Sequence, residues 1–283
     1  IAKNLYWKNK KIWIKKKSQG DELNFEVDQK DVFASTGGLN FDVKKPVIVL
    51  MHGSGLTHIV WSLHEQFLTS KGYSILSVDL PGHGSSEGPS IKSIEEIAEW
   101  IKRSLEKLKI NKISFMGHSQ GCLVGLEFAS RFPKLIKSLV LIGGSYELPV
   151  NPALIDYADG GDMKSVELMM KWGYEGVKKF IGGNPVQKII NSPRQVQEGL
   201  AVDLRACNDY KNGLKAAANI NCPTLCILGD KDKMVPLEKG KKMAESIKNS
   251  QLEVIKECGH MIIFEKAFEM REIVKNFVEK NHK

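Results

Sequence analysis

A serine, an aspartate and a histidine, far apart in the chain, have neighbours that fit nucleophilic catalysis. Ser119 lies in GHSQG, between Gly117 and Gly121, after a short apolar run and before an apolar pattern of helical period. Such a turn from strand to helix forces its central residue into a strained backbone conformation, and flanking glycines leave room for the chain to pass. The serine hydroxyl would then lie beside free N–H groups at the start of a helix, which favour an oxyanion. We therefore expect Ser119 to be a nucleophile rather than part of an ordinary glycine-rich turn.

A serine nucleophile needs a base and an acid that orients the base. His260 is the best candidate for the base among the seven histidines, because ECGHMIIFE places it in a glycine-marked loop before the last predicted helix. The acid is expected in LGDKDKMVP, where we favour Asp232 and interpret Asp230 as a turn former. The resulting chain order of serine, aspartate and histidine is that of a hydrolase triad. A surface loop histidine is the plainer alternative for His260.

A second glycine-rich loop, LMHGSG at residues 50–55, leaves another predicted strand. A loop of this kind can aim a backbone N–H at developing negative charge. We expect the main-chain N–H groups of Ser54 and Gln120 to be the two oxyanion donors. His52 is expected to hold this loop in place rather than to catalyse.

The turn DLPGHGSSEG at residues 79–88 is tight and polar. Asp79 and His83 are expected to hydrogen-bond backbone groups there, as short polar side chains commonly do in turns. For both residues we prefer this structural role in the turn to a catalytic one.

Six short apolar runs alternate with helical patterns over most of the chain, which predicts a mainly parallel sheet covered on both faces. The clearest helix spans residues 94–108, and Ser93 with Glu96 forms a capping box at its start. A helix at residues 265–280 is expected to close one face of the sheet. The predicted strands are 46–53, 73–82, 112–117, 138–144, 223–230 and 251–257, and the apolar stripe of the last helix comprises Phe268, Ile273, Val274, Phe277 and Val278.

Residues 145–220 break this alternation, because they contain no strand-like run and carry short helical patterns. We expect a small helical segment there, inserted into a core formed by residues 1–144 and 221–283. Its apolar residues could line an acyl pocket, although such residues more often pack a small helical core. The candidates for this pocket are Met163, Met169, Met170, Trp172 and Tyr174.

Composition narrows the classes of protein. The formal charge of +8 comes from 36 lysines and only five arginines, which indicates a solvated surface rather than a nucleic-acid site. No apolar run reaches the roughly 18 residues of a membrane span. Five scattered cysteines without a CxxC pair predict neither a disulfide framework nor a zinc site, and favour a reducing cytoplasm. The lysine-rich residues 3–17 alternate with apolar ones, as in a solvated edge hairpin, and no signal-peptide pattern follows them.

The motifs HGSG, DLPGHGSS, GHSQG, GDKDKMVP and GHM, in this order across residues 50–261, resemble the α/β-hydrolase superfamily. The pattern is similar to bacterial esterases with a helical cap after the sixth strand, which implies that residues 145–220 are this cap. The resemblance also implies that Ser119 is the nucleophile, Asp232 the acid and His260 the base, with no cofactor or metal. Gln120 stands where many relatives have Met, and its main-chain N–H is unaffected by the change.

The expected activity is hydrolysis of a small carboxylic ester through an acyl-enzyme. Carbon–carbon bond hydrolysis, lactone opening and perhydrolysis would use the same motifs and remain open. A non-catalytic binding module on the same scaffold is the alternative from another class, and the intact triad disfavours it.

Overall fold

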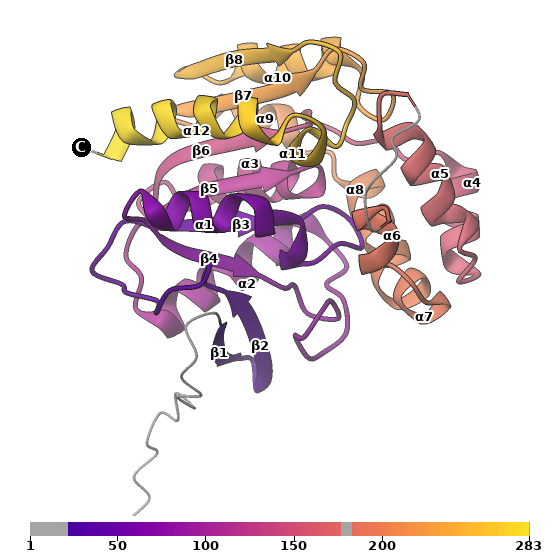
Figure 1. The fold of residues 1–283 in the computed structure, drawn as a ribbon, viewed down its shortest axis with the longest axis horizontal. Helices are drawn as coiled ribbons and strands as arrows, with labels where there is room; N and C mark the ends of the chain where they lie inside the picture. The colour runs from indigo at the N-terminus through magenta and orange to yellow at the C-terminus, as the bar shows by residue number, and fades with distance from the viewer. Residues whose placement is uncertain (1–21, 177–182, 283) are drawn as a thin grey trace, which may run out of the picture.

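One eight-stranded sheet runs through the part of the chain that the computed structural model describes, residues 22–176 and 183–282 (Figure 1). Its strand order is β1-β2-β4-β3-β5-β6-β7-β8. The pairs β1–β2 and β2–β4 are antiparallel, and all pairs from β4 to β8 are parallel. The strands are β1 Glu22–Val27, β2 Lys30–Ser35, β3 Val47–Met51, β4 Ser74–Val78, β5 Ile113–His118, β6 Ile136–Ile142, β7 Thr224–Gly229 and β8 Ser250–Ile255.

The six predicted strands correspond to β3 to β8, and the parallel arrangement is confirmed. The hairpin of β1 and β2 was not predicted, because charged residues interrupt its apolar pattern. Asp28 and Gln29 connect its strands with φ angles of 51° and 63°, as a two-residue turn requires. The edge hairpin predicted at residues 3–17 lies outside the described residues.

Helices cover both faces of the sheet, because alternate side chains of each buried strand point to opposite faces. Ile48 and Leu50 pack on the side of α1 and α12, whereas Val47 and Val49 pack on the side of α2 and α3. In Figure 1, α12 lies in front of the sheet, and α2 and α3 lie behind it. The core helices are η1 His58–Trp61, α1 Ser62–Ser70, α2 Ile94–Leu108, α3 Gln120–Arg131, α10 Leu237–Ser246, α11 Ile262–Glu265 and α12 Ala267–His282.

Helix α2 begins and ends where the sequence predicts, and the Oγ of Ser93 accepts a hydrogen bond from the Glu96 amide at 3.2 Å. The predicted final helix corresponds to α12, which packs Val274 and Phe277 against the sheet.

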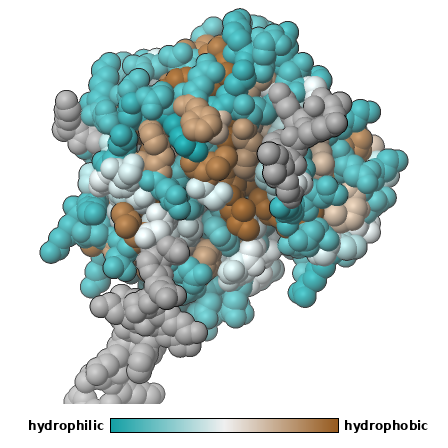
Figure 2. All heavy atoms as spheres, viewed as in Figure 1, coloured by the Kyte–Doolittle hydropathy of each residue, from teal (hydrophilic) through white to brown (hydrophobic). Residues whose placement is uncertain are grey.

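The prediction that Phe268 belongs to the buried stripe of α12 is wrong, since 81% of this residue is exposed. The buried stripe runs through Ala267, Met270 and Val274, and Phe268 is one position, about 100°, out of phase. Its ring lies 5.0 Å from the Arg271 guanidinium. Figure 2 shows apolar residues gathered near the centre of the face that carries α1 and α12.

Between β6 and β7 the chain forms only helices in its described part, as predicted for the inserted segment. We refer to residues 145–220 as the helical segment. Its helices are α4 Pro152–Asp159, α5 Lys164–Gly173, α6 Pro185–Ile189, α7 Pro193–Gln195, the π-helical η2 Val196–Leu200, α8 Ala201–Asp209 and α9 Gly213–Ala218. Helices α4 to α7 lie beyond the carboxyl ends of the parallel strands, at the right of Figure 1, and α8 leads back from them. Helix α9 instead packs against α3 and α10 behind the sheet.

Within residues 22–176 and 183–282, none of the helices has the length and apolar character needed to span a bilayer.

Candidate active site

The site forms where the order of the parallel strands reverses. β3 pairs with both β4 and β5, so the loops after β3 and β5 leave the sheet side by side at its carboxyl edge. Met51 is in register with Gly117, and a Cβ built on Gly53 would lie only 3.2 Å from the Cβ of Ser119. Ligands of open α/β sheets bind in the crevice at such a point.

Ser119 occupies the sharp corner between β5 and α3. Its φ of 56° and ψ of −116° lie in a region that side-chain-bearing residues rarely adopt, which carries strain of roughly 1–3 kcal/mol. A Cβ on Gly117 would lie 2.2 Å from the carbonyl oxygen of Gly121. One on Gly121 would lie 2.6 Å from the carbonyl oxygen of Met51. Both glycines therefore meet the steric demand predicted for this turn.

The loops after β7 and β8 bring Asp232 and His260 together. The Nδ1–H of His260 donates to the Oδ2 of Asp232 at 2.8 Å, and both side chains are 3% exposed. The Oδ1 of Asp232 accepts hydrogen bonds from the amides of Met234 and Val235, each at 2.8 Å. Burial by itself would raise the pKa of the Asp232 carboxyl, but His260 and these amides outweigh burial and lower the pKa below its ordinary 3.8. The carboxylate is thus ionised and fixed in orientation.

His118, inside the GHSQG motif, supports the loop of His260. Its Nε2–H donates to the carbonyl oxygen of His260 at 3.0 Å, and the two rings lie 5.0 Å apart. Burial, followed by the neighbouring His260, lowers the pKa of His118 to about 3, so this ring is neutral. The sequence analysis missed this contact, and the position of His118 next to Ser119 was the one available signal.

Two backbone N–H groups at the site are free. Within the described residues, neither the Ser54 nor the Gln120 amide donates to a protein acceptor. Gln120 is the first residue of α3, where N–H groups have no partner inside the helix. Ser54 lines the same cavity as Ser119.

His52 holds the loop after β3, as expected. Its Nδ1–H donates to the carbonyl oxygen of Gly53 at 2.9 Å, and its Nε2 accepts from the Leu80 amide at 3.3 Å. Burial, and then the nearby His83, lowers the pKa of His52 to about 4. A neutral ring therefore connects the two loops.

Asp79 and His83 bind backbone groups, also as expected. Asp79 accepts from the amides of His58 at 2.7 Å and Ser85 at 3.0 Å, and the Nδ1–H of His83 donates to the Pro81 carbonyl at 3.1 Å. Each side chain also has an ionisable partner that the sequence did not indicate. Asp79 faces the His58 ring at 2.9 Å, and His83 faces a carboxylate of the helical segment, Asp203.

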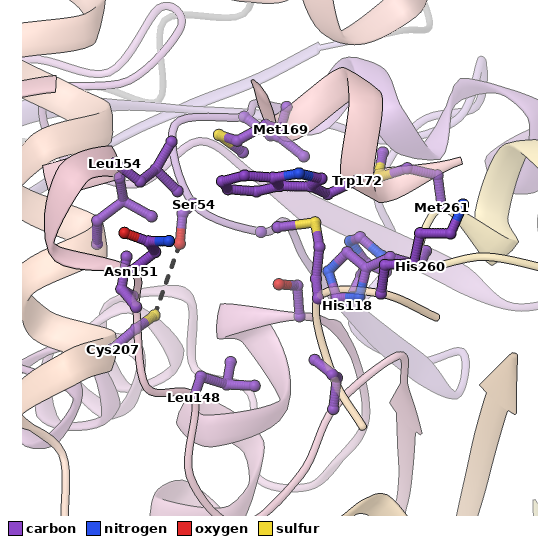
Figure 3. Close-up of a pocket in the computed structure, with 18 of the residues that line it drawn as sticks. Ser54, His118, Leu148, Asn151, Leu154, Met169, Trp172, Cys207, His260 and Met261 are labelled. Atoms are coloured by element: carbon purple, nitrogen blue, oxygen red, sulfur yellow. Dashed lines mark hydrogen bonds between the residues drawn. The ribbon is translucent and has the colours of Figure 1, made fainter. Parts of the chain in front are cut away.

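A cavity of about 450 Å³ lies between the sheet edge and the helical segment. Ser119 and His260 form part of its floor, and Met169 and Trp172 of α5 line it as predicted. Figure 3 shows the Trp172 ring above the space between Ser54 and His260. The sequence analysis missed the other walls, which are formed by Leu56, Leu148, Pro149, Val150, Asn151, Leu154, Val186, Leu204, Cys207, Lys233, Met234, Val235 and Met261.

The prediction that Met163, Met170 and Tyr174 line this cavity is wrong. Met163 and Met170 lie seven residues apart on a neighbouring stripe of the helical surface and pack in the hydrophobic cluster of the segment. Tyr174 is buried in the same cluster, and its hydroxyl donates to Asn184 at 3.5 Å. Met169 and Trp172 also pack against this cluster, and they differ from the other three residues in that they line the cavity as well.

No cluster of three or more potential metal ligands (His, Cys, Asp or Glu) occurs among the residues that the structure describes. All five cysteines are free thiols, and four of them are buried.

Comparison with known proteins agrees with the fold. Residues 46–172 and 181–267 match the family model described as alpha/beta hydrolase fold. The match spans well over half of the chain, so the protein belongs to the α/β-hydrolase fold family. Membership of this family and the hydrolases among the similar proteins identify it as a hydrolase.

Among curated proteins, the chain is 26% identical over 236 residues to 2-hydroxy-6-oxononadienedioate/2-hydroxy-6-oxononatrienedioate hydrolase 1 of Pseudomonas putida, covering 76% of this chain and 82% of that protein. It is also 26% identical to the monoacylglycerol lipase ABHD6 of Mus musculus, covering 84% and 77% of the two chains. Among solved structures, a thermophilic esterase superposes with a TM-score of 0.77 at 27% identity, covering 92% of this chain and 98% of the esterase.

Proposed function

We propose that the protein is a serine hydrolase that cleaves carboxylic esters through an acyl-enzyme on Ser119. The observation that carries this proposal is the hydrogen bond between His260 and Asp232, in a cavity that Ser119 and His260 both line. The arrangement leaves the Nε2 of His260 available as a base, because Nδ1 carries the proton shared with the carboxylate.

In the proposed reaction, the Ser119 hydroxyl attacks the ester carbonyl while His260 Nε2 accepts its proton. Asp232 stabilises the imidazolium that forms, and the free amides of Ser54 and Gln120 donate to the oxyanion. His260 then returns the proton to the leaving alcohol. Water, activated by the same histidine, releases the acid and restores the serine.

The cavity walls favour an apolar, uncharged acyl group. Among the described residues that line the cavity, Lys233 is the one lysine or arginine, and its amino group lies 3.7 Å from the Glu175 carboxylate. A carboxylate buried against the apolar walls would need a cationic partner. We therefore propose a monoester with a short or medium acyl chain, which a cavity of about 450 Å³ can hold.

Hydrolysis of a carbon–carbon bond next to a carbonyl is the second candidate. It is favoured by the relative from Pseudomonas putida, whose name gives a dioate as substrate. The same serine, histidine and oxyanion donors would serve both reactions, and the scarcity of cations in the cavity makes a dicarboxylate the less suitable substrate.

The test is a chain-length series of p-nitrophenyl esters with the parent protein and Ser119→Ala, together with lactones and β-diketones. We expect the parent to hydrolyse the shorter esters fastest and the variant to lose nearly all turnover. A fluorophosphonate probe should label the parent at Ser119. Equal ester hydrolysis by both proteins would refute the assignment, and faster cleavage of diketones than of any ester would establish the second candidate.

A further inference from the structure

A buried carboxylate of the helical segment contacts the loop that carries one proposed oxyanion donor. Asp203 of α8 is 1% exposed, and its Oδ2 accepts a hydrogen bond from the Gly55 amide at 2.8 Å. The same oxygen lies 3.1 Å from the Nε2 of His83. A carboxylate this buried is stable only when it is paired. Three segments, residues 53–55, residues 81–83 and α8, therefore meet at one oxygen atom.

The contacts of His83 indicate that its ring is charged. Nδ1 already donates to the Pro81 carbonyl, so Nε2 can face the Asp203 carboxylate favourably only with a second proton on the ring. Burial would lower the pKa of His83, but attraction to Asp203 outweighs it and raises the pKa. Burial would raise the pKa of Asp203, and His83 lowers it instead. The neighbouring His52 stays neutral and adds no positive charge beside His83. The contacts of His83 and Asp203 therefore describe an imidazolium that faces a carboxylate.

Other residues on the same face of the helical segment also contact this loop. The Sγ of Cys207, four positions after Asp203, lies 3.6 Å from the Oγ of Ser54, as the dashed line in Figure 3 marks. A Cβ on Gly55, whose φ is +68°, would lie 2.9 Å from the Cβ of Leu200. Leu200, Asp203 and Cys207 thus form one stripe that presses on residues 54 and 55.

We propose that Asp203, ion-paired with His83, is a positioning residue for the amide of Ser54. By holding the next amide along the chain, that of Gly55, it sets the orientation of the loop from which Ser54 donates. The helical segment, which lines part of the substrate cavity, thereby also fixes the orientation of one oxyanion donor. The proposal rests on the proposed function, because it assigns Ser54 N–H to the oxyanion. Asp203 itself contacts no reacting atom in this scheme.

The test compares Asp203→Asn with the parent. Asn is nearly the same size but is a weaker, uncharged acceptor for Gly55 and leaves His83 without its counterion. A loop shift of about 1 Å can reduce turnover up to about 10²-fold, so we expect kcat on p-nitrophenyl butyrate to fall about 10- to 100-fold. KM should change less than about twofold, because the oxyanion contact forms in the transition state.

The matched control is Asp159→Asn. Asp159 is another carboxylate of the helical segment, and it pairs with Arg205 of α8 at 2.5 Å, outside the described cavity lining. Breaking this pair disturbs the same helix without touching residues 52–55, so kcat should stay within about twofold. Binding of a trifluoromethyl ketone, whose adduct carries an oxyanion, should weaken in parallel with kcat for Asp203→Asn alone.

Two readouts do not depend on ester turnover. Hydrogen exchange at the Gly55 amide should accelerate at least tenfold in Asp203→Asn, and the His83 ring should titrate at lower pH than in the parent. If Asp203→Asn does not fold, His83→Gln provides the same test, with the same direction expected for kcat and for exchange.

The proposal is overturned if kcat and Gly55 exchange match the parent, or if Asp159→Asn shows the same losses. A parent without ester turnover would refute the proposed function instead. In that case, hydrogen exchange at Gly55 that is unchanged in Asp203→Asn would still show that Asp203 does not hold the Gly55 amide.

Discussion

Replacement of Asp232 by Asn tests how the site controls the proton on His260. The Oδ1 of Asp232 accepts two backbone amides at 2.8 Å, and its Oδ2 faces the Nδ1 of His260 at 2.8 Å. An Asn that keeps its oxygen on the amides must direct its NH₂ group at Nδ1. The ring must then accept at Nδ1 and carry its proton on Nε2, where it cannot take the proton of Ser119. The variant would hold the wrong tautomer in an otherwise unchanged site.

The expected loss is large. The equivalent change in serine proteases lowers kcat by about 10⁴, which corresponds to about 5 kcal/mol at 1.36 kcal/mol per factor of ten. The variant should still fold, because Asn keeps both amide contacts, and thermal unfolding followed by circular dichroism checks this. Turnover of p-nitrophenyl butyrate under saturating conditions measures kcat.

The control for this experiment is Asp230→Asn, two positions earlier in the same loop. The Oδ1 of Asp230 accepts one amide, that of Cys258, at 3.4 Å. Replacing Asp230 should leave kcat within about threefold of the parent, because this carboxylate does not contact His260 or any group that transfers a proton in the reaction. The reasoning fails if Asp232→Asn keeps more than about a tenth of parent kcat, or if Asp230→Asn loses as much.

Three further predictions follow from contacts on the same edge of the sheet. Gly117→Ala would place a methyl group 2.2 Å from the Gly121 carbonyl oxygen, so the free energy of unfolding should fall by about 3 kcal/mol or more, measured in urea. Trp172→Ala removes the wall above the reacting groups, so kcat/KM for the butyrate ester should fall about tenfold and the optimum should move to longer acyl chains. The pair of His83 and Asp203 should stabilise the fold most between the ordinary pKa values of its members, 3.8 and 6.5. The stability difference between the parent and Asp203→Asn should shrink as pH falls through the lowered pKa of Asp203 or rises through the raised pKa of His83.

Each of these predictions has an outcome that contradicts it. A Gly117→Ala protein as stable as the parent would mean that the corner can relax. Gly160→Ala serves as its comparison, because Gly160 has a φ of −75° and an added Cβ there would meet nothing closer than 3.6 Å. An unchanged ester preference in Trp172→Ala would remove this residue from the substrate cavity. The pH measurement must consider His52, 5.3 Å from His83, and Asp79, which also acts on it. A stability difference that stays constant from pH 4 to 9 would show that His83 is not the group that titrates.

Local sequence patterns were sufficient for the parallel core. The runs that became β3 to β7 are short, mainly apolar and buried almost throughout, as expected of strands covered on both faces. The run of β8, at the edge of the sheet, is partly polar and is exposed or half-buried except at its last residue. The strained corner at Ser119 was also predictable, because its glycines are required by atoms only four residues apart or on the adjoining strand. The choice of Asp232 over Asp230 agrees with the hydrogen bond to His260, although the catalytic roles await the experiments above.

The walls of the cavity were not predictable in the same way. Met169 and Met170 are adjacent in the sequence, identical in type and packed against the same cluster, yet Met169 lines the cavity and Met170 does not. Helical phase relative to a partner surface decides between them, and the sequence does not state where that surface lies. Phe268 shows the same limit, since it fits an apolar pattern but is 81% exposed.

The sequence by itself determined the order of the strands along the chain, the corner at Ser119 and the identity of the histidine and aspartate that pair. Hydrophobic periodicity and local sterics largely specify the strands and the corner. The histidine and the aspartate were identified from the loops that carry them and from their order in the chain. Only the tertiary structure decided that Asp203 reaches the loop of Ser54 from a helix 148 residues away. A buried carboxylate is stable there because His83 and the Gly55 amide converge on it, and that convergence is produced by packing of the helical segment on the sheet edge.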